Sequence, residues 1–233
     1  MIESTKGISL RYYKYSDRSV IAKIYTEEFG LQSYVMKGIR NKNSKNKLNL
    51  LQSLNIIQLE VTNNSKRNLQ YVKEIRRDGD LSMIFRNMEK RFLCLFMSEI
   101  LLKVLVDAEK DNSLFSFIED TVISLNQPEK ISKNFSLTFL LNLSHYLGFY
   151  PSKSDSRKEI FDLESGCFTD HSVYHNICGV NKNYFSSLLE KEEIDIPFQN
   201  RKELLKSIQK YYSLHHYNIE SLKSYEVIES LRI

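Results

Sequence analysis

Apolar and polar side chains alternate with a period of two residues through much of the first third of the chain, which is typical of half-buried β-strands. Turn-forming pairs such as Ser16-Asp17 and Asn63-Asn64 separate the alternating segments, and no long helical pattern comes between them. About five short strands within ~80 residues favour a small closed barrel such as an OB-fold. The predicted strands are residues 7–13, 19–26, 31–37, 54–61 and 69–75.

From Ile84 onward the apolar period changes to three and four residues, which predicts helices. The first helix is expected from Ile84 to Val106, and Asn112-Ser113 is expected to cap the second. We therefore predict an α+β fold, in which a five-stranded OB-fold barrel in residues 1–80 is followed by an all-helical domain in residues 81–233. Further helices are expected at 135–147, near 181–185 and 200–205, and at 219–231, with a short strand near 160–163.

The composition is that of a folded protein, because 42% of the 233 residues are hydrophobic and 27% are charged. Residues 1–80 contain 15 basic and 8 acidic residues, a net +7, whereas the rest of the chain is net −3. The N-terminus has no apolar signal-peptide core, and no apolar run is long enough to span a bilayer. These features predict a cytoplasmic protein with a cationic N-terminal module and no membrane contact.

A lysine-rich segment without acidic residues follows the third predicted strand. Asn, Ser and Lys dominate it, so it has little to bury and suits a polyanion whose phosphates it can neutralise without reading bases. The alternative is a solvated loop that keeps a sheet edge soluble. The predicted DNA-binding residues are Lys37, Arg40, Lys42, Lys45 and Lys47, helped by Arg67, Arg76 and Arg77.

Tyrosines are frequent in the predicted barrel, and aromatic rings on such barrels can stack on nucleic-acid bases. For each tyrosine the alternative is packing inside the barrel. The candidates are Tyr12, Tyr13, Tyr25, Tyr34 and Tyr71.

Four residues of types that bind zinc lie close together in the sequence: Cys167, His171, His175 and Cys178. A helix over residues 167–178 would place the four side chains near one face. The β-branched and Asp/Asn residues within the segment disfavour such a helix. The alternative is that Cys178 is a small buried side chain and that the histidines lie on the surface or pack.

Short motifs in a fixed order identify a family resemblance over nearly the full length of the chain. The motifs are Gly7-Ile-Ser-Leu-Arg11, Tyr15-Ser-Asp-Arg18, Thr26-Glu-Glu-Phe-Gly30, Val35-Met-Lys-Gly-Ile-Arg40, Leu51-Gln-Ser-Leu-Asn55 and Leu147-Gly-Phe-Tyr-Pro151, with Leu222-Lys-Ser224 near the end. In this order they resemble the RecO family of bacterial recombination mediators.

The resemblance implies an N-terminal OB-fold, a helical domain and a role in DNA repair and recombination without catalytic turnover. Expected activities are binding of single- and double-stranded DNA, annealing of complementary strands and, with RecR, loading of RecA onto DNA coated by single-stranded-DNA-binding protein. Many family members carry a CxxC…CxxC zinc module after the Gly-Phe-x-Pro segment. Here Ser152-Lys-Ser-Asp-Ser156 supplies no cysteine pair, so we expect a degenerate, zinc-free insert near residues 150–178.

The resemblance also implies binding to the acidic C-terminal tail of the single-stranded-DNA-binding protein, and a cytoplasmic, nucleoid-associated location. Such a tail needs an apolar pocket with a cation at its rim. The alternative for both groups of candidate cations is an ordinary solvated helix face. The groups are Lys90, Arg91 and Lys103 on the first long helix and Arg201, Lys202 and Lys206 on a later one.

A second function class stays open, in which the chain is a helical protein-interaction scaffold whose barrel is only structural. The sequence contains no phosphate loop, no nucleophile-and-base set and no paired carboxylates of clear geometry. We therefore expect no enzyme activity, no catalytic residue, no cofactor and no bound metal.

Overall fold

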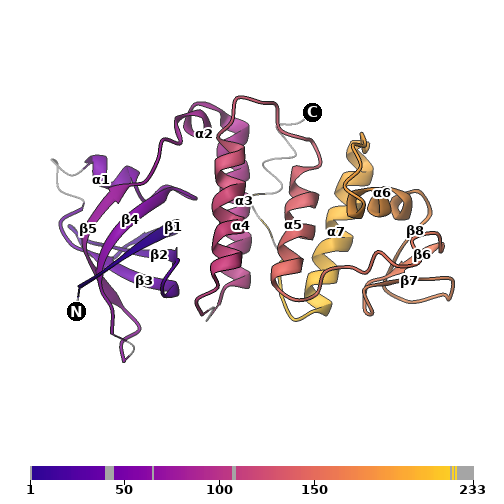
Figure 1. Ribbon diagram of the computed structural model, residues 1–233, viewed down its shortest axis with the longest axis horizontal. Helices are drawn as coiled ribbons and strands as arrows, with labels where there is room; N and C mark the ends of the chain where they lie inside the picture. Colours follow the sequence, from indigo (N-terminus) through magenta and orange to yellow (C-terminus); the bar gives the residue numbers. More distant parts are fainter. Residues whose placement is uncertain are drawn as a thin grey trace. The chain divides into compact units, whose positions relative to one another are not determined.

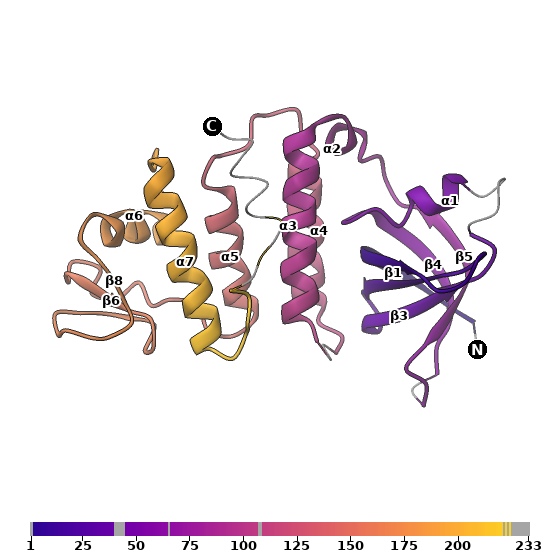
Figure 2. The ribbon, with the colours of Figure 1, turned by 180° about the vertical axis from the view of Figure 1, so that it is seen from behind.

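The computed structural model describes residues 2–39, 45–64, 66–106, 109–220, 222 and 224, with the side chains of 45 and 46 excepted (Figures 1 and 2). The chain divides into two compact units, which are described separately. The first comprises Met1–Pro128 with Leu222–Ile233, and the second comprises Glu129–Ser221. The expected domain boundary at residue 80 follows the end of the barrel, and it stays a prediction.

Five strands form a closed barrel in the order β1-β2-β3-β5-β4, so the five-stranded OB-fold barrel expected from the sequence is confirmed. All neighbouring strands are antiparallel except β3 and β5, which run parallel and close the barrel. The long strand β1 pairs with both β2 and β4. The strands are β1 (Ile2–Lys14), β2 (Val20–Thr26), β3 (Gly30–Met36), β4 (Ile56–Thr62) and β5 (Gln70–Arg77).

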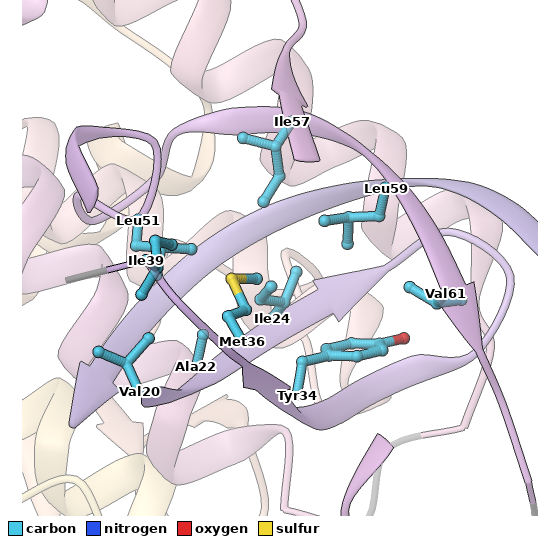
Figure 3. Packing of buried hydrophobic residues seen from close by; sticks show 10 residues of the cluster. All are labelled: Val20, Ala22, Ile24, Tyr34, Met36, Ile39, Leu51, Ile57, Leu59 and Val61. Carbon is cyan, nitrogen blue, oxygen red and sulfur yellow. The ribbon is translucent and has the colours of Figure 1, made fainter. Parts of the chain in front are cut away.

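Alternate residues of the strands fill the inside of the barrel (Figure 3). Gly7 lies where β1 pairs with both β2 and β4, opposite Thr26 and Ile57. A Cβ atom at this position would lie 2.8 Å from the Ile24 Cγ2 atom, so only glycine fits between these strands. The labelled core side chains are Val20, Ala22, Ile24, Tyr34, Met36, Ile39, Leu51, Ile57, Leu59 and Val61.

The helices of the first unit differ from the expected ones at three points. A short helix, α1 (Lys45–Asn49), forms within the segment that we expected to be a loop. The expected helix from Ile84 to Val106 is two helices, α2 (Ser82–Arg86) and α3 (Met88–Val104), because Asn87 is extended and its side chain accepts a hydrogen bond from the Lys90 amide. The cap of α4 (Asn112–Leu125) is Asp111 and not Asn112-Ser113.

The second unit combines α5 (Phe135–Tyr146), α6 (Gly179–Leu189) and α7 (Phe198–Leu214) with a small antiparallel sheet. The sheet has the order β7-β6-β8, so the domain is not all-helical in this segment. The strand expected near 160–163 is confirmed as β6 (Ile160–Asp162). Its two neighbours are three residues each, too short for an alternating pattern to be read: β7 (Cys167–Thr169) and β8 (Asn176–Cys178). Most of the helix expected at 219–231 lies outside the described residues.

Aromatic side chains form the core of the small sheet against α6 and α7. Phe161 and Phe168 are buried in contact with each other, and Phe161 also contacts Phe185 and Tyr211. Gly166 has a φ of +68°, and a Cβ there would lie 2.8 Å from the Tyr211 hydroxyl oxygen. Phe161 and Phe168 are therefore core residues of the insert. None of the helices in the described ranges is long and apolar enough to cross a lipid bilayer.

Candidate nucleic-acid interface

Five of the eight predicted DNA-binding side chains lie in the described part of the chain, and all five are exposed on the barrel unit. Lys37 follows β3, Lys47 lies in α1, and Arg67 lies in the turn between β4 and β5. Arg76 and Arg77 end β5. The five side chains do not form a single cluster. Lys37 lies near the start of β5, whereas Arg76 and Arg77 lie at the other end of the same strand. Arg40 and Lys42 lie outside the described residues, as does the side chain of Lys45.

Strand register shows which side chains share the outer face of the barrel. Ala22 and Ile24 fill the core, so Ile21 and Lys23 point outward. Lys23 lies opposite Arg11 on β1 and Ser33 on β3, which forms a polar and basic row across three strands.

A second outward row lies two residues away along the strands. Tyr13 of β1 lies opposite Ile21, Ile21 opposite Val35 of β3, and Val35 opposite Tyr71 of β5. Tyr13 and Tyr71 are 49% and 40% exposed, whereas Val35 is buried in the middle of the row. The row therefore runs from an exposed tyrosine on β1 to an exposed tyrosine on β5, three strand steps around the closed barrel.

A cation lies over each of these two rings. The Lys37 Nζ atom is 5.4 Å from the centroid of the Tyr71 ring, and the Arg11 Cζ atom is 5.5 Å from that of Tyr13. Both distances are within the range of a cation–π interaction. Sequence reasoning missed Arg11 and Lys23, although their two-residue spacing from Tyr13 and Ile21 would have placed them on the same face.

The other candidate tyrosines do not face this surface. Tyr25 and Tyr34 are fully buried, and burial raises the pKa of each to about 12. Tyr25 packs on Phe115 of α4 and Tyr34 lies in the barrel core. Tyr12 lies opposite Ala22 and lines a separate cavity beside α3. The packing alternative is therefore correct for Tyr25 and Tyr34.

The cations of the outer face differ from Lys6, another basic residue of β1, in that Lys6 forms ion pairs. The Lys6 Nζ atom lies 2.9 Å from Glu119 and 3.6 Å from Asp78, and the hydrogen bond to Glu119 raises the lysine pKa. Within the described part of the chain, Arg11, Lys23, Lys37, Lys47, Arg67, Arg76 and Arg77 make no such ion pair. Their charge is available to a polyanion.

A cavity of about 650 Å³ lies within the first unit, between the barrel end and α3. Its lining includes the apolar side chains of Leu10, Leu51, Leu95 and Leu102, and the basic side chain of Arg91. The Glu99 carboxylate also lines it and accepts hydrogen bonds from the Ser224 amide at 3.0 Å and hydroxyl at 2.5 Å.

The six predicted partner-binding cations differ in how exposed they are to solvent. Lys90 is only 4% exposed, and its ammonium donates to the Gln127 carbonyl oxygen. Arg201 is 6% exposed and donates to the Ile196 carbonyl oxygen at 2.6 Å. Arg91, Lys202 and Lys206 are exposed, and Lys103 is half-buried. Only Arg91 of the six lines the described cavity.

The four possible zinc ligands lie on strands and turns, where they cannot share one face of a helix. Cys167 and Cys178 are exposed on β7 and β8, which lie on opposite sides of β6. Within the described ranges, no three His, Cys, Asp or Glu side chains come close enough to hold a metal ion. Cys178 is exposed, so its expected burial is wrong. The residues present do not fit the zinc module of the resemblance.

Comparison with known proteins covers both units of the chain. A family model described as "Recombination protein O N terminal" matches residues 1–78, and one described as "Recombination protein O C terminal" matches residues 86–170. Three similar proteins carry the name "DNA repair protein RecO". That of Azobacteroides pseudotrichonymphae is 30% identical over 99% of both chains. That of Flavobacterium psychrophilum is 31% identical over 97% of this chain and 98% of its own, and that of Bacteroides fragilis is 29% identical over 99% of both.

Proposed function

The chain belongs to the RecO family of DNA repair proteins, and we propose that it binds single- and double-stranded DNA and anneals complementary strands. The observation that carries the proposal is the outer face of the barrel, where exposed cations without ion-pair partners lie beside exposed tyrosines. An interface of this kind attracts phosphates and releases their counterions.

Annealing follows from the same charges by a simple physical argument. Two complementary strands repel each other through their phosphates, and cations that neutralise those phosphates lower the repulsion. Phosphate contacts carry no sequence information, so the protein would accept any pair of complementary strands. This role needs no catalytic group and no turnover, and it is that of a recombination mediator.

The direct test uses the full chain with a fluorescently labelled oligonucleotide, alone and as a duplex. Anisotropy should rise on titration with protein at low salt, and the affinity should fall linearly with salt on logarithmic axes. A stopped-flow mixture of complementary strands should anneal faster with the protein than without it. Failure to bind either DNA at low salt would remove the proposal and favour a protein-interaction scaffold with a structural barrel.

The proposal extends to two protein partners: RecR, and the single-stranded-DNA-binding protein, whose tail combines acidic residues with an apolar C-terminus. With them the chain would help to load RecA onto coated DNA, acting in the cytoplasm at the nucleoid. The apolar cavity lined by Arg91 suits such a tail in size and chemistry. The exposed pair Lys202 and Lys206 on α7 is the competing site.

Charge reversal separates the two sites. We expect a labelled tail peptide to bind the wild-type protein and to bind at least tenfold more weakly to Arg91→Glu. Reversal of both Lys202 and Lys206 should leave the affinity unchanged. The opposite pattern would assign the tail to α7, and binding that survives all three reversals would exclude both sites.

A further inference from the structure

The cavity beside α3 combines exposed apolar and basic side chains. Tyr12 and Leu95 line it and are 39% and 47% exposed. Arg11 and Arg91 are exposed lining residues as well. An apolar hollow with cations beside it suits an amphipathic peptide that also carries acidic residues.

The chain itself comes to the wall of this cavity near residue 224. Leu222 is buried, with 6% of its surface exposed. Ser224 lines the cavity, and its amide and hydroxyl donate to the Glu99 carboxylate at 3.0 Å and 2.5 Å. Residues 225–233 therefore continue from a point that is fixed at the cavity.

The sequence of residues 225–233 is amphipathic and acidic: Tyr-Glu-Val-Ile-Glu-Ser-Leu-Arg-Ile. On a helix, Val227, Ile228 and Leu231 would share one face, and the two glutamates would lie on the opposite face. Two acidic residues and one basic residue give the segment a net charge of −1. It has the composition that the cavity suits.

Charge and length both match the cavity. Among the described residues, the charged members of the lining are Arg11, Arg91 and Glu99, which give a net +1 against the −1 of the segment. Glu99 and Arg91 are two turns apart on α3, about 12 Å. Nine residues span about 13 Å as a helix and about 30 Å when extended. The segment can therefore reach from Ser224 past Arg91 in either conformation.

We infer that residues 225–233 occupy this cavity, with their apolar side chains against its leucines and their glutamates near Arg11 and Arg91. The segment is then an intramolecular competitor of any acidic, apolar peptide that binds there. Its occupancy stands on the contacts of Ser224, whereas its effect on the partner's tail rests on the proposed function. A tail must displace the segment first, so its apparent affinity falls with the fraction of molecules whose cavity is filled.

Amide hydrogen exchange of the full chain, followed by mass spectrometry, tests the occupancy. We expect the amides of residues 225–233 to be protected in the wild type. Leu95→Glu places a carboxylate in the cavity, where it repels the glutamates of the segment, and should speed their exchange at least tenfold. Met88→Glu is the matched control, because Met88 is also on α3, is 59% exposed and does not line the cavity in the described part of the chain. An unprotected segment in the wild type, or equal protection in Leu95→Glu, would overturn the inference.

A labelled peptide with the sequence of residues 225–233 tests the same point from outside. It is added to the full-length wild type and to the full-length double variant Ile228→Asp/Leu231→Asp, whose own segment has lost its apolar face. We expect the peptide to bind the double variant at least tenfold more tightly, and the further change Arg91→Glu to remove this gain. Circular dichroism shows whether each variant is folded. Equal binding to the two proteins, or binding to neither, would overturn the occupancy.

The tail peptide of the proposed partner separates the inference from the proposed function. We expect it also to bind the double variant at least tenfold more tightly than the wild type. Equal affinity for both proteins would overturn the role of the segment as a competitor. A tail that binds neither protein would remove the proposed partner and the competition with it, while a protected segment in the exchange experiment would still support occupancy of the cavity.

Discussion

At the scale of single residues, Lys182 shows how the insert near residues 150–178 is connected to α6. Its side chain is 7% exposed, and its Nζ atom donates to the Ser156 carbonyl oxygen at 2.6 Å. The same ammonium lies 5.6 Å from the centroid of the Phe168 ring. One cation thus joins α6 to both the loop before β6 and the small sheet, a connection that needs no metal.

Replacement of Lys182 by methionine keeps an unbranched side chain of similar length and removes the charge. We expect Lys182→Met to lower the free energy of unfolding by about 2 kcal/mol, the order found for a hydrogen bond to a charged group. Urea unfolding of the full chain measures it. Lys202→Met, on the exposed face of α7, is the matched control and should change stability little. Equal stability of the two variants would mean that aromatic packing alone holds the insert.

The separated cysteines lead to a prediction about metal content. We expect less than stoichiometric zinc in protein purified without chelator, because Cys167 and Cys178 lie on strands on either side of β6. Elemental analysis by mass spectrometry provides the measurement. One tightly bound zinc per chain that disappears in Cys167→Ser would contradict a zinc-free insert.

At the scale of secondary-structure elements, the start of α4 depends on one carboxylate. The Asp111 Oδ1 atom accepts hydrogen bonds from the Ser113 amide at 2.9 Å and the Leu114 amide at 3.0 Å. The Ser113 hydroxyl donates to the same oxygen, and these bonds lower the pKa of Asp111 below its usual value. The ionised carboxylate therefore stabilises the folded state.

The pH dependence of this cap follows from the lowered pKa. Its stabilisation is fully present above the unfolded pKa of about 3.9 and is lost as pH falls through the lower folded value. Asp111→Ala should lower the free energy of unfolding by about 1 kcal/mol at neutral pH. This difference from the wild type should shrink as the pH falls below the unfolded pKa of the carboxyl group, about 3.9. Urea midpoints between pH 7 and pH 3 measure both effects, with Asp17→Ala in the β1–β2 turn as control. A difference that is constant with pH would mean that the charge of Asp111 plays no part.

Elements with a clear period were predictable from the sequence, and those set by single contacts were not. The five barrel strands alternate inside and out, so their pattern is visible without the structure. The break at Asn87 depends on one side chain that accepts from the Lys90 amide within an otherwise helical pattern. The strands β7 and β8 pair with β6 over three residues each, too few for a period.

The candidate site likewise has features that the sequence predicts and features that depend on contacts between distant segments. The basic character of residues 37–47 is evident from composition, but the pairing of Lys37 with Tyr71 depends on the parallel contact between β3 and β5. Two residue pairs define that contact, and they join segments that are distant in the sequence. Burial of Tyr25 by Phe115 likewise depends on a helix far along the chain.

At the scale of the whole molecule, charge is divided between the barrel and the rest of the chain. The net charge of residues 1–80 is +7 and that of the remainder is −3. In the proposed DNA binding, a polyanion would be attracted to the first region and weakly repelled by the second. The proposed DNA binding therefore rests on the charges of the barrel region, and residues 37–47 are the densest group of cations in it.

The most direct test is the slope of binding affinity against salt concentration, on logarithmic axes, for a labelled single strand. The test variant replaces Lys37, Arg40, Lys42, Lys45 and Lys47 by serine, and the control replaces Lys130, Lys153, Lys191, Lys202 and Lys206, five exposed lysines of the second unit. For the test variant we predict weaker binding and a slope flatter by about one unit for each phosphate that the protein no longer neutralises, with little change in the control. An unchanged affinity and slope in the test variant would show that the basic segment is only a solvated edge of the barrel.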